Sequence, residues 1–420
     1  MRILHVLHTS LPFLCGYSIR SAHILREQRR LGLELFVVTS ARHPNGKDAV
    51  ELIEGIEHRR TPSYRGRSWA LWREWCLMRQ LKREVSRAAR EWRPDVIHAH
   101  SPVLVGLPAL HVARRLGTPF VYEVRDLWEN ASVDRGRFAQ GSVQYRLARA
   151  VESFVLRRAD AIVTICEALR AELITRLPPT TNVQVVANGV DTNAFSPRPE
   201  DTALRNKLGL QGKRVLLYAG AFQPYEGLEV LIDAMPSLLS RLPQSHLVIV
   251  GGRPPQASPT SPSLEDALRA RVRDLALNGS VTFTGQVPHA EMLSYYSIAD
   301  VVVYPRLLTD TTALTTPLKP LEAMASGRAI LVSDLPPMRE LVQDRVSGLC
   351  FPPADAAALA ARCLELLGDS QLRARLGAAA RRSVVAERQW VTLASCYKSV
   401  YDQSLHTRSA SPLPPASQSP

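Results

Sequence analysis

Short apolar runs rich in β-branched residues alternate with amphipathic segments along most of the chain. The run at 2–8 precedes a helical pattern over 18–31, and the run at 95–100 precedes one over 102–116. This alternation predicts an α/β protein whose parallel sheets are covered by helices on both faces. The expected strands are 2–8, 33–39, 95–100, 119–124, 160–165, 183–187, 214–220, 246–252, 281–285, 300–305 and 328–333. The expected helices are 18–31, 102–116, 142–158, 167–176, 226–240, 263–277, 289–297, 317–326, 354–367, 370–386 and 388–404.

The alternation stops at 188–213, a polar segment that contains prolines, and starts again with "RVLLYAG". A chain of 420 residues is long for one domain, so the pause predicts a hinge between two doubly wound domains. We expect these domains to span 1–195 and 196–387. The last residues, 406–420, are rich in Pro and Ser and are expected to be disordered.

The composition is that of a protein of the cytoplasm. No stretch reaches the roughly 20 consecutive apolar residues of a membrane span. The N-terminal "MRILHVLHTSLPF" fits a buried first strand better than a signal peptide. The six cysteines are scattered and form no C-x-x-C pair, which favours reduced thiols and argues against a zinc site. We therefore expect a soluble cytoplasmic protein without a bound metal.

The positive charge lies mostly in the first half. Residues 1–190 hold 29 Lys and Arg against 18 Asp and Glu, a net of +11 out of +13 for the chain. No nucleic-acid recognition motif accompanies this charge, so a nucleic-acid partner is not expected. An anionic membrane surface is the other candidate.

Segment 59–93 concentrates this charge, with eleven Lys and Arg, three acids and four of the six tryptophans. On a helix, Trp72, Trp75 and Arg79 share a face, and Trp69 sits one turn earlier. Such a stripe either packs in the core or binds anionic lipid at the inner membrane. The basic residues that favour water or lipid headgroups are Arg65, Arg67, Arg73, Arg79, Lys82, Arg83 and Arg87.

In doubly wound sheets, ligands bind beyond the carboxyl ends of the strands. "VYEVRDLWEN" places Glu123, Arg125 and Asp126 at such an end, where charged groups are either paired with one another or used for chemistry. In "DVIHAH", His98 and His100 point to the same face of a strand. We expect His98 to be a core histidine and His100, nearer the loop, to reach the ligand.

The loop at 8–21 enters a helix and has one glycine, Gly16, so it lacks the G-x-G-x-x-G dinucleotide fingerprint. It is either a ligand-facing loop or an ordinary turn. In "YAGAFQPYEGLEVLIDAM", Gly220 and Gly227 allow a close backbone approach.

"TTPLKPLEAMASG", at 315–327, enters a helix whose exposed N–H groups and positive dipole favour phosphate. Lys319 adds a charge there, and the carboxylate of Glu322 suits a vicinal diol such as that of a ribose. The stretch therefore predicts a nucleotide-diphosphate site. Alternatively, Glu322 lies in the first helical turn only because the dipole favours an acid there.

Several motifs together resemble one enzyme family. "LEAMASGRAILVSDLPPMRELVQDRVSGLCFPPAD" is similar to the C-terminal signature of family 4 glycosyltransferases with the GT-B fold. "NGVD", "YAGAF…EGLEVLIDA", "VTFTGQVPHAEM" and "YYSIADVVVYP" precede it in the expected order. "YEVRDLWEN", "PYEGL", "YPR" and "TPLKPLEAMA" further resemble the branch found with exosortase/PEP-CTERM exopolysaccharide systems.

The resemblance implies two Rossmann-like domains that face a cleft, with a helix at 388–405 returning to the acceptor-side N-terminal domain. It implies retaining transfer of a sugar from a nucleotide-diphosphate sugar to a hydroxyl of a glycan or lipid-linked acceptor, without cofactor or metal. The implied catalytic candidates are His100, Glu123, Arg125 and Asp126. The implied donor-binding candidates are Gly16, Gly220, Val287, Arg306, Thr315, Thr316, Lys319 and Glu322.

The chain departs from the family pattern at three positions. Leu314 stands where the first glutamate of the E-x7-E motif belongs, and Ala221 and Glu226 replace the usual phosphate-binding Arg and Lys. Arg306 and Lys319 are the basic residues near the right loops and are expected to compensate. Two alternatives stay open: a nucleotide-sugar epimerase, and a non-catalytic nucleotide-sugar-binding protein.

Overall fold

The protein is described by a computed structural model over residues 1–44, 49–62, 70–253 and 263–410. It divides into two compact units: residues 1–188 with the C-terminal segment that begins at Trp390, and residues 189–389. The observed boundary falls seven residues before the expected one at 195. Val190 explains this, because its N–H donates to the carbonyl of Arg388 at 2.8 Å and joins the start of the second unit to its end. Each unit is described by itself.

The first unit is built on an eight-stranded sheet in the order β3-β4-β2-β1-β5-β6-β7-β8. All neighbouring strands are parallel except β3 and β4, which form an antiparallel hairpin at one edge. The strands are β1 (Arg2–Leu7), β2 (Glu34–Thr39), β3 (Val50–Ile53), β4 (Ile56–Arg60), β5 (Val96–His100), β6 (Phe120–Val124), β7 (Ala161–Thr164) and β8 (Val183–Val185).

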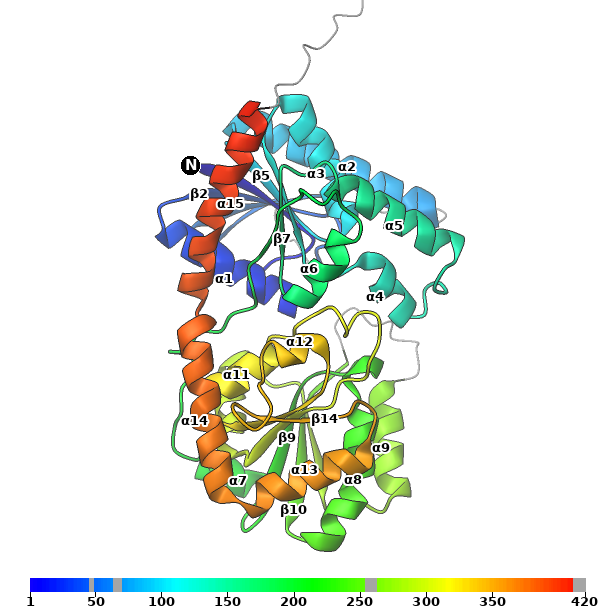
Figure 1. Cartoon of the computed structure of the whole chain (residues 1–420), viewed down its shortest axis with the longest axis vertical. Helices are drawn as coiled ribbons and strands as arrows, with labels where there is room; N and C mark the ends of the chain where they lie inside the picture. Colours follow the sequence, from blue (N-terminus) through cyan, green and yellow to red (C-terminus); the bar gives the residue numbers. More distant parts are fainter. Residues whose placement is uncertain (45–48, 63–69, 254–262, 411–420) are drawn as a thin grey trace, which may run out of the picture. The chain divides into compact units, whose positions relative to one another are not determined.

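Helices cover both faces of this sheet (Figure 1). α1 and α15 pack together on one face, and α2 and α3 pack together on the other, where α3 also contacts α5. Their bounds are α1 (Gly16–Arg30), α2 (Ala70–Trp92), α3 (Val103–Leu116), α4 (Trp128–Asp134), α5 (Val143–Leu156), α6 (Glu167–Ile174) and α15 (Trp390–Ala410). The return of the last helix to the first unit is confirmed.

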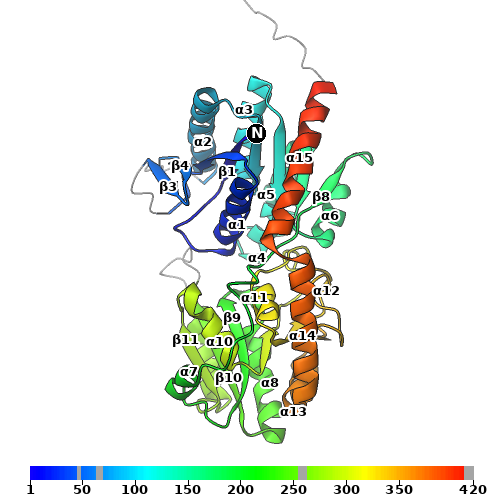
Figure 2. The same cartoon turned by 90° about the vertical axis from the view of Figure 1, so that its left-hand side faces the viewer.

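Helices α2 and α4 were not among the expected helices, and two further features of the first unit differ from the expected elements. The β3–β4 hairpin beside α2 (Figure 2) was not expected, and Arg59 ties it to α2 by an ion pair with Glu91 at 2.8 Å. Helix α15 continues to Ala410, so disorder from residue 406 was wrong for 406–410. The first helix-breaking proline of the tail is Pro412, which explains why the helix extends that far. Residues 411–420 lie outside the described residues.

The second unit is a six-stranded parallel sheet in the order β11-β10-β9-β12-β13-β14. Its strands are β9 (Arg214–Ala221), β10 (Ser245–Gly252), β11 (Val281–Gly285), β12 (Val301–Tyr304), β13 (Ala329–Ser333) and β14 (Leu349–Phe351). The order reverses between β9 and β12, and ligands bind at such a switch point outside the carboxyl ends of the strands.

The helices of the second unit follow its strands in alternation. They are α7 (Thr202–Lys207), η1 (Pro224–Glu226), α8 (Leu228–Arg241), α9 (Leu264–Asp274), η2 (His289–Glu291), α10 (Met292–Ile298), α11 (Lys319–Ala325), α12 (Pro336–Arg339), α13 (Ala356–Gly368) and α14 (Ser370–Glu387). α7 lies within the segment that was expected to be a linker. Among the described helices of both units, none is both long enough and apolar enough to cross a lipid bilayer.

Two glycines bring backbone segments together at the switch point. Gly227, at φ +68°, is the N-cap residue of α8, and a Cβ there would lie 2.0 Å from the carbonyl oxygen of Pro305. Gly251, at φ +137°, would place a Cβ 1.8 Å from the carbonyl oxygen of Gly220. Glycine is therefore required at both positions, and the ends of β9, β10 and β12 are packed closely.

Candidate functional site

In the second unit, Lys319 and Glu322 lie in the first turn of α11 and contact each other. The Lys319 Nζ donates to both carboxylate oxygens of Glu322, at 3.2 and 2.9 Å. The spacing of three residues brings the two side chains together on one helix face. Helix α11 has seven residues, so these side chains, more than a long helix dipole, set the charge here.

Glu322 accepts from two further side chains that the sequence did not single out. His289 Nε2 donates to Oε1 at 3.1 Å, and the Tyr296 hydroxyl donates to Oε2 at 3.1 Å. Burial would raise the pKa of Glu322, but Lys319 and His289 outweigh it and hold the pKa below its ordinary value. The carboxylate is 5% exposed and ionised. His289 lies in the "VPHAEM" motif. The position of this motif directly after β11 is the sequence signal by which His289 could have been found.

Arg306, at the end of β12, is buried and already engaged. Its Nη1 donates to the carbonyl of Thr315 at 3.0 Å, and its Nε lies 3.3 Å from a carboxylate oxygen of Glu226. Burial raises the pKa of Glu226, against the opposing pull of Arg306. Arg306 was expected to compensate for the missing phosphate-binding pair. It is instead paired with Glu226, which stands where the family pattern has a lysine. Lys319, whose side chain is 28% exposed, is the more accessible of the two cations.

The remaining donor-site candidates, except Gly16, lie at or near the carboxyl edge of the same sheet. Gly220 is in β9, where a Cβ would lie 2.7 Å from the Tyr218 hydroxyl. Val287 follows β11 and is half-buried, Leu314 is half-buried, and Thr316 is buried. Gly16 belongs to the first unit, where it is the exposed first residue of α1.

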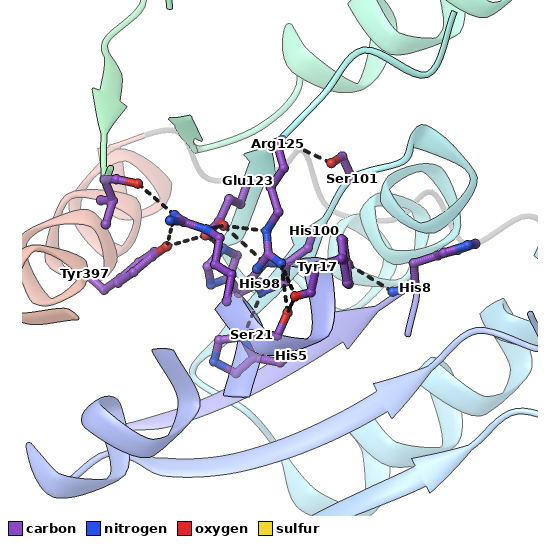
Figure 3. Close-up of polar contacts among 12 residues, drawn as sticks. His5, His8, Tyr17, Ser21, His98, His100, Ser101, Glu123, Arg125 and Tyr397 are labelled. Atoms are coloured by element: carbon purple, nitrogen blue, oxygen red, sulfur yellow. Dashed lines mark hydrogen bonds and ion pairs between the residues drawn. The ribbon is translucent and has the colours of Figure 1, made fainter. Parts of the chain in front are cut away.

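In the first unit, three of the four catalytic candidates are buried: Glu123 is 0% exposed, His100 1% and Arg125 7%. Figure 3 shows these three side chains in contact with one another. Arg125 Nε donates to Glu123 Oε1 at 2.8 Å, and Arg125 Nη2 donates to His100 Nδ1 at 2.7 Å. The geometry therefore favours the first of the two alternatives for this cluster, in which the charged groups pair with one another, over direct contact with a substrate. His98 was expected to be a core histidine and His100 to reach the ligand; both rings are buried, and a contact of His100 with the ligand stays a prediction.

Burial alone would raise the pKa of Glu123, but Arg125 and Arg20 outweigh it and hold the pKa well below its ordinary value. Arg20 Nε donates to Glu123 Oε1 at 3.0 Å, and Tyr397 of α15 donates its hydroxyl to Oε2. Neither Arg20 nor Tyr397 was singled out from the sequence. Nothing in the sequence pairs them with Glu123, which lies 274 residues away from Tyr397.

Asp126 is the catalytic candidate that keeps a half-buried side chain at the carboxyl end of β6. The hydroxyl of Ser101 donates to its Oδ1 at 3.3 Å. Burial raises the pKa of Asp126 above its ordinary value, although Arg135 and Ser101 oppose the rise. A half-buried carboxylate at this edge can accept a hydrogen bond from a hydroxyl group.

A group of cations around His8 was also missed, and one of them, Arg135, also acts on Asp126. Burial and then Arg42, Arg135 and Arg137 lower the pKa of His8, which follows β1, to about 4. Arg42 follows β2 and pairs with Glu74, while Arg135 and Arg137 follow α4. The "DRGRF" sequence after a short helix was the signal available for this basic edge.

Within the described residues, one group of three histidines has metal-ligand atoms close together: His5, His98 and His100, within 4.8 Å of one another. Their ring nitrogens are already engaged in hydrogen bonds: His5 Nδ1 and His100 Nε2, for example, are 3.0 Å apart. The Arg125 guanidinium also contacts His100, and a cation there opposes a metal ion. The donor set fits a hydrogen-bond network better than a metal centre.

Two family models match the chain: "Glycosyl transferase 4-like domain" over residues 16–189 and "Glycosyl transferases group 1" over residues 200–383. Among curated relatives, a D-inositol 3-phosphate glycosyltransferase of Frankia alni is 31% identical and covers 87% of this chain and 89% of its own. A glycogen synthase of Mycobacterium tuberculosis is 29% identical, with coverages of 96% and 94%.

Solved structures are similar over nearly the whole chain. A sucrose-phosphate synthase of Thermosynechococcus elongatus has a TM-score of 0.79 at 22% identity and covers 98% of this chain and all (100%) of its own. HepE of Anabaena, solved in complex with UDP, has a TM-score of 0.73 at 18% identity, with coverages of 96% and 100%. These likenesses show that both units together have the GT-B fold.

Proposed function

Because the chain belongs to the family 4 glycosyltransferases, we propose that it transfers a sugar from a nucleotide-diphosphate sugar to a hydroxyl group of an acceptor. The observation that carries this proposal is the Lys319–Glu322 pair at the carboxyl edge of the second unit's sheet. It offers a cation for phosphate and a carboxylate for a diol. The UDP complex of the similar HepE structure supports a nucleotide-sugar donor.

We propose a retaining reaction that uses no enzymic nucleophile, cofactor or metal. The leaving diphosphate assists deprotonation of the acceptor, and the protein stabilises the charge that develops on the phosphates. Lys319 forms an ion pair with the phosphates, and the carboxylate of Glu322 accepts hydrogen bonds from the two hydroxyls of the ribose. In the first unit, Asp126 accepts a hydrogen bond from the acceptor hydroxyl and orients it.

The acceptor is proposed to be a glycan or a lipid-linked glycan of the cell surface, in keeping with the resemblance to the exosortase/PEP-CTERM branch. The group of cations at Arg42, Arg135 and Arg137 supports an acceptor that carries negative charge near its hydroxyl. Localisation in the cytoplasm, at the inner membrane, follows as part of the same proposal.

A second candidate, a non-catalytic nucleotide-sugar-binding protein, is favoured by Leu314, Ala221 and the Glu226–Arg306 pair. An epimerase is the third. Incubating the purified protein with radiolabelled UDP-glucose and GDP-mannose, with and without cell-surface glycan, separates them. Label in glycan supports transfer, an epimerised donor supports the epimerase, and bound but unchanged donor supports the binding protein.

Lys319 provides the first prediction. Lys319→Ala should weaken binding of UDP or GDP by about 1.5–3 kcal/mol, the range for a charge-assisted hydrogen bond, and leave uridine or guanosine binding nearly unchanged. Isothermal calorimetry measures both, with Lys207→Ala, an exposed lysine of α7, as the control. Equal loss for nucleoside and nucleotide would show that Lys319 acts through folding, not through phosphate.

Glu322 provides a second prediction that separates its two readings. Glu322→Gln should weaken binding of ribonucleotides by about 1.5–3 kcal/mol, and binding of 2′,3′-dideoxyribonucleotides far less, since those lack the diol. His289 and Tyr296 contact the same carboxylate, so a thermal melt must accompany the titrations. If both nucleotide types lose affinity equally, Glu322 is structural.

The basic segment 59–93 is proposed to bind an anionic membrane. Trp72 and Trp75 of α2 are 56% and 44% exposed and stack with ring centroids 4.8 Å apart, so core packing does not account for them. Leu81 and Val85 form the buried side of the helix. Exposed arginines share the outer side: Arg73, Arg79, Arg83, Arg87 and Arg90. Trp69, Arg65 and Arg67 lie outside the described residues.

Vesicle sedimentation tests this surface. The protein should bind vesicles that contain phosphatidylglycerol, and binding should fall as salt rises, because each basic residue contributes about 1 kcal/mol that salt screens. Replacing Trp72 and Trp75 by Ala should reduce binding, whereas Val391→Ala, an exposed apolar residue of α15, should not. Equal binding to neutral vesicles, or binding to neither, would contradict the proposal.

A further inference from the structure

Helix α15 sends two fully buried phenols, Tyr397 and Tyr401, into the polar interior of the first unit. Both side chains are 0% exposed, and both hydroxyls have partners on elements far away in the sequence. Figure 3 shows Tyr397 pointing from α15 toward Glu123. The C-terminal helix is therefore part of a polar network as well as of the packing.

The hydrogen bonds of this network have a fixed direction. An arginine only donates, so His100 Nδ1 accepts from Arg125 Nη2 at 2.7 Å and carries no proton. The proton of His100 is then on Nε2, which donates to His5 Nδ1 at 3.0 Å. By the same reasoning His5 Nε2 donates to Gln28 Oε1 at 2.9 Å.

The network continues in this direction as far as His98. Gln28 Nε2 donates to the Tyr401 hydroxyl at 2.8 Å, and that hydroxyl donates to His98 Nδ1 at 2.9 Å. The remaining nitrogen of His98, Nε2, lies 3.6 Å from Glu123 Oε2, beyond hydrogen-bond distance, and has no hydrogen-bond partner among the described residues. Glu123 Oε1 accepts from Arg125 Nε at 2.8 Å. The hydrogen bonds therefore form an open circuit that starts at Arg125, with a gap between His98 and Glu123.

Tyr397 contacts this circuit at Glu123, the carboxylate of the circuit. Its hydroxyl donates to Glu123 Oε2 and accepts from Arg20 Nη2 at 3.2 Å. Arg20 is in turn held by the carbonyls of Val186 and Ala187, at 2.7 and 2.8 Å. Tyr397 is thus the contact through which α15 fixes Glu123.

The circuit leads from Glu123 to Asp126 over a short path. Arg125, whose guanidinium is bound to Glu123, also donates its backbone N–H to Ser101 Oγ at 3.1 Å. Ser101 N–H donates to the carbonyl of Glu123 at 2.8 Å, and Ser101 Oγ donates to Asp126 Oδ1 at 3.3 Å. The position of the Asp126 carboxylate therefore depends on the position of Arg125 and Ser101.

We propose that Tyr397 is a positioning residue for Asp126, so that the C-terminal helix sets the geometry of the acceptor-side carboxylate from the interior of the first unit. This inference rests on the proposed function, in which Asp126 orients the acceptor hydroxyl. Tyr397 itself touches no substrate in this scheme. It acts through Glu123, Arg125 and Ser101.

Tyr397→Phe tests the proposal, because it removes one hydroxyl and keeps the ring. Tyr401→Phe is the matched control: it is on the same helix, equally buried, and bonded to Gln28 and His98 but not to Glu123. The first readout is turnover of UDP-glucose and GDP-mannose, followed as release of nucleoside diphosphate. Tyr397→Phe should lower kcat about 10-fold with little change in donor KM, since a displaced group near the reaction costs rate more than donor binding.

The second readout does not need activity. It is the pKa of Asp126, to be followed by carboxyl NMR. Burial raises this pKa, and Arg135, the Ser101 hydrogen bond and Arg125 lower it. Tyr397→Phe should raise this pKa, because a loosened Ser101 no longer stabilises the charged form, and Tyr401→Phe should change it less.

The two readouts separate the inference from the function beneath it. A wild-type protein that consumes neither nucleotide sugar counts against the proposed function, and the NMR result still decides the role of Tyr397. Equal effects of Tyr397→Phe and Tyr401→Phe on kcat and on the Asp126 pKa would overturn the inference and leave both tyrosines as packing residues.

Discussion

Glu123→Ala should destabilise the first unit by about 3–5 kcal/mol, because it leaves two buried guanidinium groups without their carboxylate. Glu123 is 0% exposed, and its oxygens accept from Arg20, Arg125 and Tyr397. Urea unfolding followed by tryptophan fluorescence measures the change. All six tryptophans fall within the sequence ranges of the first unit, so their fluorescence reports on that unit alone.

The matched control is Glu167→Ala, which also removes a glutamate that pairs with an arginine. Glu167 is 61% exposed and lies 3.0 Å from Arg170, three residues along α6. An exposed pair of this kind contributes roughly 0–1 kcal/mol. A loss for Glu123→Ala as small as that for Glu167→Ala would contradict the view that Glu123 is held as an ionised group in the interior.

Those parts of the fold that depend on local periodicity could be predicted from the sequence. The alternation of apolar runs and amphipathic segments gave both sheets, since burial on two faces makes each parallel strand apolar. Spacing gave the common face of His98 and His100 on β5. The sequence also placed Lys319 and Glu322 at the start of one helix, although it did not predict that they pair with each other. Each of these follows from the period of one element.

The partners of buried charges could not be predicted in this way. Glu123 was expected near a ligand because a charged group at a strand end needs a partner, and the sequence does not say which one. Its partner Tyr397 comes from the far end of the chain. Arg306 was likewise expected to meet phosphate, and it is bound to Glu226, the residue that made a replacement cation necessary. Chemistry set by long-range packing is not visible in a single element's pattern.

Acidification should destabilise the first unit through its buried histidines, against the opposite and smaller contribution of Glu152, whose pKa burial raises to about 8. Burial lowers the pKa of His100 to about 4, and lowers the pKa of His5 and His98 well below the ordinary value. Between pH 6.5 and 4, these histidines bind protons in the unfolded chain but not in the folded unit, so their contribution to stability is full above this window and is lost as pH falls through it. For His100 alone, the loss between pH 7 and pH 5 is about 2 kcal/mol.

The geometry gives the same direction by a separate route. Each ring nitrogen of His5 and His100 already has one assigned partner, and an added proton would set two donors against each other, His100 against Arg125 or His5 against His100. Urea unfolding at pH 7 and pH 5, followed by tryptophan fluorescence, should show the loss. His406→Gln, an exposed histidine of α15, should leave it unchanged. Equal stability at the two pH values would mean that the three rings take up protons without disturbing their neighbours. The hydrogen-bond directions assigned to the circuit of Arg125, Glu123 and α15 would then be wrong.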